Sequence, residues 1–150
     1  MRVVIQRVSK ALVRVNNVVT GQIKKGALIY LGIEEADDKT DAVWLVNKIK
    51  QLRIFDDDKR TMNLSVQDIY GEILIISQFT LHAKTKKGNR PSYVRAAHQE
   101  KATQLYNFFI QQFIETTTLK IQTGIFGARM MVESVNDGPV TIIIDTKNKE

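Results

Sequence analysis

The sequence contains no cysteine and only two histidines, His82 and His98. Without cysteine there can be no disulfide, no thiolate zinc site and no cysteine nucleophile. Two histidines are too few for a catalytic zinc centre that needs three. No other cluster of metal-ligating residues stands out, so we expect neither a metal ion nor any other cofactor.

Long apolar runs are also missing. No segment approaches the roughly 18 apolar residues of a membrane span, and the opening MRVVIQRV is too short and too interrupted for a signal peptide. The chain has 150 residues, of which 43% are hydrophobic and 25% charged, which is ordinary for a globular domain. No repeat or linker divides it, so we expect a single domain over residues 1–150. Because neither a membrane span nor a signal peptide is recognisable, we expect a cytoplasmic protein without a membrane partner.

The sequence has more positive than negative charge. The net charge is +6 and the isoelectric point is about 9.6, which weakly favours a polyanionic partner such as nucleic acid. Five positive charges and no acid fall in KTKKGNRPSYVR, residues 84–95. This stretch is either a solvated loop or a phosphate-contacting loop, in which Tyr93 is available to stack on a base. The candidate RNA contacts are Lys86, Lys87 and Arg90.

Hydrophobic periodicity predicts a strand-rich chain with two helices. Apolar positions from Ala42 to Leu52 recur at helical spacing behind Asp37 and Asp38, either of which can cap a helix. A second helical pattern runs from about Ser92 to Glu115. Because the strands do not alternate with helices, we expect an α+β fold with a curled, barrel-like mixed sheet. The expected strands are 2–8, two strands around the turn at 16–17, 27–33, 72–81, 119–124, 128–135 and 140–145.

The first candidate for chemistry is SQFTL, Ser77–Leu81, where an apolar strand abruptly turns polar. Polar groups at the end of a buried strand need hydrogen-bond partners, and neighbouring loops can supply them. The functional alternative is a pocket lined by the Gln78 amide, the Thr80 hydroxyl and the backbone N–H groups of Phe79 and Thr80. On an ideal strand His82 would point the same way as Thr80 and could assist.

The second candidate is NDGPVT, residues 136–141, which leads directly into the apolar run IIID. Proline lacks a backbone N–H, and glycine reaches backbone conformations that other residues cannot. Gly138 and Pro139 therefore indicate either a simple turn or a backbone shape that is itself functional. An X–Pro bond can be cis, but the sequence does not give the isomer.

SQFTL followed by NDGPVT, in a chain that opens with MRVVIQRV, resembles the bacterial and eukaryotic D-aminoacyl-tRNA deacylase family. The stretches RIFDDDKRTMNLSV, GNRPSY and QTGIFGARM are also similar, so the resemblance covers essentially the whole chain. It implies a homodimeric, barrel-like enzyme that hydrolyses the ester between a D-amino acid and the 3′-terminal adenosine of tRNA. The implied partners are tRNA and a second copy of the chain, not DNA.

The resemblance also implies roles for individual residues. Gly138 and Pro139, joined by a cis bond, would reach into the partner subunit's site beside the matching Ser77–Leu81 stretch. Their carbonyl oxygens would exclude an L side chain, while glycine, which has no Cβ, would escape this filter. Activity on glycyl-tRNA mischarged on tRNA-Ala is therefore expected. Arg7 would hold the dipeptide, and Phe126 and Met130 would line the adenosine end of the pocket.

Several alternatives remain open at the level of sequence. Thr80 could be a nucleophile, but no base is evident, which favours water attack assisted by the substrate's own ribose hydroxyl, with the Phe79 and Thr80 N–H groups stabilising the oxyanion. A relative with a trans Gly-Pro bond would admit L-alanyl-tRNA. A non-catalytic tRNA-binding dimer would need only the basic loop, but it leaves both motifs unexplained.

Overall fold

The computed structural model describes residues 1–150 as eight strands, two α-helices and one short 3-10 turn. Strands occur before, between and after the helices, as the α+β prediction requires. In chain order the elements are β1 (Arg2–Val15), β2 (Val18–Ile23), β3 (Gly26–Gly32), α1 (Lys39–Gln51), β4 (Phe55–Asp56), β5 (Met62–Leu64), β6 (Glu72–Ser77), η1 (Phe79–His82), α2 (Gln99–Thr116), β7 (Ile121–Thr123) and β8 (Met131–Asp145).

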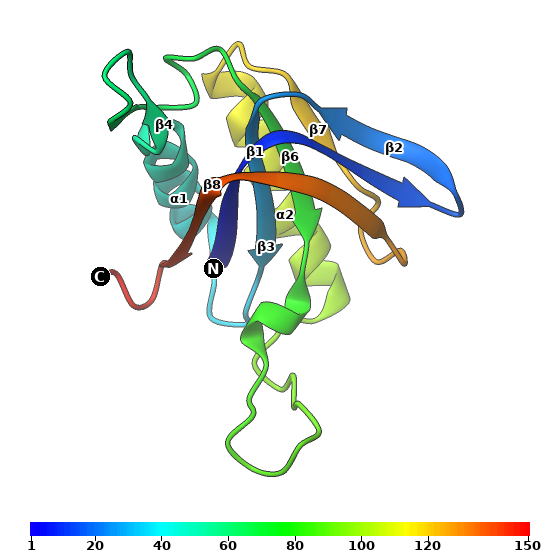
Figure 1. Cartoon of the computed structure of the whole chain (residues 1–150). Coiled ribbons are helices and arrows are strands. Elements are labelled where there is room, and N and C mark those ends of the chain that lie inside the picture. The colour runs from blue at the N-terminus through cyan, green and yellow to red at the C-terminus, as the bar shows by residue number, and fades with distance from the viewer.

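The long strand β1 organises the sheet. On one edge it pairs antiparallel with β3 and then β2, and on the other edge it pairs antiparallel with β8 along most of its length. Beyond β3 the sheet continues in parallel through β6 and β7. It then curls until β7 lies near β2, where the Gln22 N–H donates to Gln122 Oε1 at 3.5 Å (Figure 1). The predicted curled, nearly closed mixed sheet is therefore confirmed.

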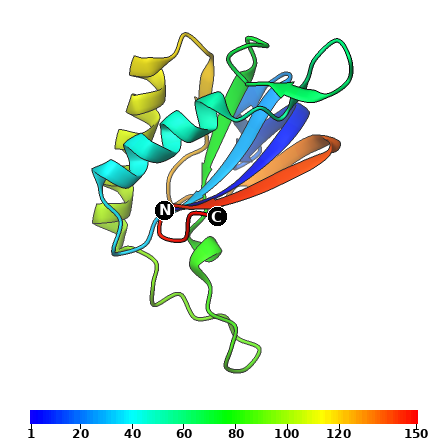
Figure 2. The same cartoon turned by 90° about the vertical axis from the view of Figure 1, so that its left-hand side faces the viewer.

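Both helices cover one side of the sheet (Figure 2). The N-terminus of α1 is capped by Asp38, whose carboxylate accepts from the N–H groups of Thr40 and Asp41, while the Asp41 carboxylate accepts from the Asp38 N–H. This reciprocal capping box satisfies N–H groups that the first turn leaves unpaired. The first helix thus begins where the sequence pattern predicts.

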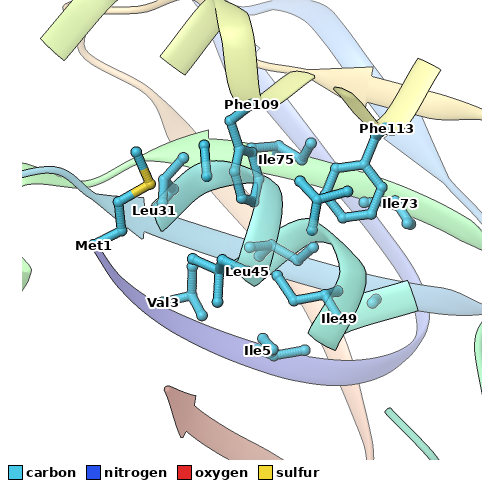
Figure 3. Packing of buried hydrophobic residues seen from close by; sticks show 14 of the residues in the cluster. Met1, Val3, Ile5, Leu31, Leu45, Ile49, Ile73, Ile75, Phe109 and Phe113 are labelled. Atoms are coloured by element: carbon cyan, nitrogen blue, oxygen red, sulfur yellow. The ribbon is translucent and has the colours of Figure 1, made fainter. Parts of the chain in front are cut away.

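The main hydrophobic core lies between the helices and the sheet. Leu45 and Ile49 of α1 meet Phe109 and Phe113 of α2 above the apolar side chains of the strands (Figure 3). Along β6, Ile73 and Ile75 face this core, whereas Leu74 and Ile76 face a second cluster on the opposite side of the sheet. Alternating side chains of one strand are thus buried on both faces, which explains the nearly continuous apolar sequence of β6.

Two expected boundaries are wrong because tertiary contacts end the elements. The strand predicted over 72–81 stops at Ser77, since β3 ends at Gly32 and the ladder has no further partner. The helix predicted from Ser92 begins only at Gln99. The Glu35 N–H donates to the Arg95 carbonyl, and the Ala97 N–H donates to the Ile33 carbonyl. These hydrogen bonds hold the segment before Gln99 against the loop that follows β3, so its backbone does not form helical turns.

Two pairs of expected strands are in fact single strands. The segments 2–8 and 11–15 form one strand, β1, and the segments 128–135 and 140–145 are both covered by β8 from Met131 onward. The β4–β5 hairpin was not expected, because its strands have only two and three residues. No helix in the structure is both long and apolar enough to cross a membrane.

Candidate active site

A cavity of about 460 Å³ opens where β3 and β6 end. Its floor is apolar, and Ser77 and Gln78 place polar groups at its edge. The start of α2 contributes Gln99 and Ala102 to its rim. The segment between β7 and β8 forms the remaining wall, with Phe126, Gly127, Ala128 and Met130.

The SQFTL stretch forms a tight turn rather than the end of a strand. The Gln78 N–H donates to the Leu31 carbonyl at 2.8 Å, and the chain then enters the 3-10 turn η1. The Gln78 side-chain amide donates a short hydrogen bond to Thr80 Oγ1. Phe79 and Thr80 occupy the first positions of the turn, where backbone N–H groups have no partner within the turn. Phe79 lines the cavity, whereas Thr80 does not, so the role of these N–H groups as pocket donors stays a prediction.

Phe79 is unusually exposed for a phenylalanine beside a cavity. More than half of its surface, 56%, is accessible. Its ring packs edge-on against Tyr93, with the ring centroids 5.0 Å apart. Tyr93 therefore contacts the turn that carries the polar pocket groups, and it retains an exposed face.

The expected orientation of His82 is wrong. The ring lies beside Gly32, where a Cβ would approach His82 Cδ2 to 3.1 Å, and the residue is only 2% exposed. Neither ring nitrogen has a hydrogen-bond partner. Burial lowers the pKa of the imidazole below its usual value. Because a turn replaces the expected strand, His82 points into the protein and supports η1 instead of assisting Thr80.

Phe126 and Met130 lie in the wall of the same cavity as Ser77 and Phe79. The Phe126 ring packs against Tyr106 with the centroids 5.3 Å apart. Tyr106 donates its hydroxyl proton to the Ile75 carbonyl at 2.9 Å, and burial raises its pKa. The phenol therefore stays protonated and holds this wall against β6. Tertiary structure brings together residues that are far apart in sequence, although the role of Phe126 and Met130 toward adenosine stays a prediction.

Gly138 and Pro139 lie in a bulge within β8, not in a turn before a strand. The peptide bond between them is cis, the isomer that the resemblance implies. In the ladder Gln6 pairs with Thr141 and Val8 with Asn136, so the intervening residues of β8 leave the regular register. Gly138 has a φ of 131°, which favours glycine. Both residues of the dipeptide are exposed.

Arg7 lies opposite this bulge and is nearly buried. Its Nε donates to the Asp137 carbonyl at 2.9 Å, so it contacts the backbone immediately before Gly138. Its role in holding the dipeptide stays a prediction. Gly138 and Pro139 do not line the cavity of their own chain. Within one chain the structure therefore does not bring the two sequence motifs together.

The basic stretch projects away from the body of the protein (Figures 1 and 2). Paired backbone hydrogen bonds between Lys84 and Ser92 close its base. Lys86, Lys87 and Arg90 are exposed and have no ion pair in the structure. Arg95 differs, because its guanidinium pairs with the Glu34 carboxylate at 2.6 Å. Lys84 is likewise exposed and unpaired, so four of the five basic residues are available to an anionic partner.

Sequence reasoning missed the contribution of Gln99 and Ala102 to the cavity, because it placed them inside a longer helix. It also missed Ile54 and Asp56, which contact Arg7. The resemblance in RIFDDDKRTMNLSV marked this segment but gave no role for it. No three His, Cys, Asp or Glu side chains lie close enough together to hold a metal ion.

The curled mixed sheet, the two helices on one side of it, the polar-edged cavity where β3 and β6 end and the cis Gly-Pro bulge define a small α+β protein with a candidate site at the edge of its sheet. The chain belongs to the D-Tyr-tRNA(Tyr) deacylase family, whose model matches residues 4–145. The family resemblance of the sequence motifs is therefore confirmed.

Several relatives match the chain from end to end. Proteins from Flavobacterium psychrophilum and Phocaeicola vulgatus, both named D-aminoacyl-tRNA deacylase, are 57% identical over 150 residues and cover 100% of each chain. Among solved structures, the c-Myc DNA Unwinding Element Binding Protein has 39% identity and a TM-score of 0.92, covering 97% of this chain and 98% of its own. A probable eukaryotic D-amino acid tRNA deacylase is 17% identical, with a TM-score of 0.79 and coverage of 95% and 97%, and shares the fold.

Proposed function

We propose that this protein hydrolyses the ester bond of D-aminoacyl-tRNA and releases a free D-amino acid and tRNA. Full-length relatives that are 57% identical carry the name D-aminoacyl-tRNA deacylase. The observation that carries the proposal is the shared cavity, in which the Ser77–Phe79 segment meets Phe126 and Met130. Aromatic and apolar walls suit a nucleoside, and polar groups at one edge suit an ester.

The pocket supports attack by water rather than by a side chain. Gln78 donates to Thr80 Oγ1, and no side-chain base contacts that hydroxyl, because His82 is buried away from it. A water oxygen adds to the ester carbonyl carbon, and the vicinal ribose hydroxyl of the substrate assists proton transfer. The Phe79 and Thr80 N–H groups stabilise the oxyanion. The ester C–O bond then breaks, and the ribose oxygen leaves with a proton.

We infer that the active form is a homodimer in which each subunit completes the other's site. The outer edge of β8 has no strand partner. Unpaired edges of this kind readily accept a strand of another chain. On the exposed surface of this strand lie Val135, Pro139 and Ile143, the last 68% exposed. Since the Gly-Pro bulge does not reach the cavity of its own chain, a partner's cavity is the site that it can serve.

In this arrangement the filter works by exclusion. The carbonyl oxygens of Gly138 and Pro139 would occupy the space that an L side chain needs, while a D side chain would point toward solvent. Rejection of the abundant competitor suits a cell rich in L-aminoacyl-tRNA. Glycine lacks a side chain, so glycyl-tRNA mischarged on tRNA-Ala should also be hydrolysed.

The decisive test compares deacylation of D-tyrosyl-tRNA and L-tyrosyl-tRNA by the purified protein in the presence of EDTA. We expect rapid loss of the D ester and persistence of the L ester. Glycyl-tRNA-Ala serves as a third substrate. If tRNA binds but neither ester is cleaved, the catalytic proposal fails and a tRNA-binding dimer takes its place.

A further inference from the structure

The guanidinium of Arg7 connects two parts of the chain that are distant in sequence. On one side its Nε donates to the Asp137 carbonyl at 2.9 Å. On the other side its Nη1 donates to the Ile54 carbonyl at 2.8 Å and to Asp56 Oδ1 at 3.1 Å. The β4–β5 hairpin is thereby linked through one side chain to the Gly138-Pro139 bulge.

The positive charge of Arg7 is balanced by nearby carboxylates, and Asp56 is one of them. The guanidinium is only 8% exposed, and a nearly buried positive charge needs a negative partner. Two carboxylates are available: Asp56 at 3.1 Å from Nη1, and Asp137 at 3.7 Å from Nε. Asp56 draws the guanidinium toward the hairpin, which leaves Nε directed at the carbonyl of Asp137 rather than at its carboxylate.

The bulge is sensitive to the position of this guanidinium. A Cβ built on Gly138 would lie 2.8 Å from Arg7 Nη2, so the two groups are in close contact. A second hydrogen bond closes the bulge from within β8: Asn136 Oδ1 accepts from the Val140 N–H at 3.2 Å. Phe55, which is 1% exposed, anchors the hairpin in the core and gives Asp56 a fixed backbone.

We propose that Asp56 is a positioning residue for the Gly138-Pro139 filter and acts through Arg7. This inference rests on the proposed function. Without the Asp56 charge, the guanidinium turns toward the Asp137 carboxylate, releases the Asp137 carbonyl and loosens the bulge. The expected consequence is weaker rejection of L substrates, with little effect on hydrolysis of the D ester.

The test is the isosteric, neutral substitution Asp56→Asn, measured by single-turnover deacylation of D-tyrosyl-tRNA and L-tyrosyl-tRNA. Asp58→Asn is the matched control, because Asp58 lies in the same segment, is exposed and makes no hydrogen bond or ion pair. Asp56 is 45% exposed, so we expect the D-to-L rate ratio to fall about two- to fivefold, as for a partly exposed ion pair. Asp56→Glu, which keeps the charge, should restore most of the ratio.

Two further measurements separate positioning from a general structural effect. In an Arg7→Gln background, which removes the positive charge that Asp56 pairs with, Asp56→Asn should cause no additional loss of selectivity, because its effect passes through Arg7. Hydrogen exchange at the Val140 amide should accelerate in Asp56→Asn and not in Asp58→Asn. An unchanged rate ratio together with unchanged exchange at Val140 overturns the assignment, and so does a fully additive effect in the Arg7→Gln background.

The same experiment distinguishes failure of the inference from failure of the proposed function. If the wild-type protein cleaves both esters equally or neither, the proposed function is wrong. Exchange at Val140 then decides by itself whether Asp56 holds the bulge. If wild type discriminates and Asp56→Asn behaves like Asp58→Asn in both measurements, only the inference about Asp56 fails.

Discussion

At the scale of single residues, the turn after β6 places the Thr80 hydroxyl beside the Gln78 amide, with no base beside the hydroxyl. Gln78 lines the cavity, whereas Thr80 does not. Thr80 Oγ1 accepts the Gln78 amide proton, which leaves the hydroxyl proton free to donate. This arrangement fits a group that orients water or substrate better than one that attacks the ester. Substitution of Thr80 should distinguish the two roles, because loss of a nucleophile abolishes activity whereas loss of an orienting group only reduces it.

Thr80→Ala is expected to retain most of the deacylase activity, with kcat reduced by no more than about tenfold, the equivalent of one hydrogen bond. Single-turnover rates on D-tyrosyl-tRNA measure this, with Thr80→Ser as the control that keeps the hydroxyl. Complete loss of activity with normal tRNA binding would show that Thr80 is the nucleophile.

His82 should control part of the pH dependence of stability. Its pKa is lowered in the folded protein by burial, so below the ordinary value near 6.5 the unfolded chain binds more protons than the folded chain. The free energy of unfolding should therefore decrease as the pH falls through about 6.5. Carboxylates with lowered pKa values, such as Asp145, contribute only at more acidic pH, below about 4.

Urea denaturation between pH 7.5 and pH 5 tests this prediction. His82→Phe should lose stability less steeply than wild type over this range, whatever its stability at pH 7.5. His98→Phe is the control, because His98 is exposed. Equal slopes for wild type and His82→Phe would contradict the role of the buried imidazole.

At the scale of elements, the basic loop is a separate projection, closed at its base by the Lys84–Ser92 bridge. Its exposed cations can be neutralised without disturbing the core. Each phosphate contact contributes about 0.7 to 0.9 to the slope of log K against log salt. The charge of the loop can therefore be separated from the chemistry of the cavity.

Changing Lys86, Lys87 and Arg90 together to Gln should weaken tRNA binding and reduce its salt slope by about 2. Filter binding at 50 to 300 mM salt measures the slope. Lys59→Gln with Arg60→Gln, at exposed positions of the β4–β5 hairpin, is the control. If the salt slope does not change in the triple variant, these residues do not contact RNA.

At the scale of the whole molecule, the proposed homodimer rests on the unpaired edge of β8 and on the separation of the Gly-Pro bulge from the cavity of its own chain. The exposed apolar side chain of Ile143 lies on this strand. Burying a charge there without a partner would be unfavourable. A lysine at this position should therefore oppose association of two copies while leaving the fold intact.

Analytical ultracentrifugation should find wild type as a dimer at micromolar concentration and Ile143→Lys shifted toward monomer. The variant should also lose D-ester selectivity, since the filter would no longer reach a partner's cavity. Ile114→Lys, on an exposed position of α2 that is 53% accessible, is the matched control. A wild-type monomer that retains full selectivity would contradict the cross-subunit filter.

The sequence by itself determined the features that depend on local periodicity and composition. The helical spacing from Ala42 to Leu52 and a cap at Asp37 or Asp38 predicted α1, because a buried face and a cap act within one element. The structure has the cap at Asp38. The strand-rich pattern predicted the α+β class. The motifs SQFTL and NDGPVT indicated the family, which the relatives confirm.

Only the tertiary structure decided how distant segments meet. The end of β3 turned Phe79–His82 into a 3-10 turn and buried His82, since a strand without a ladder partner does not continue. The pairing of β8 with β1 made Gly138-Pro139 a bulge opposite Arg7. The contact of Asp56 with Arg7 joins residues 49 positions apart. A sequence pattern records which face of an element is apolar, but not which far part of the chain packs against it.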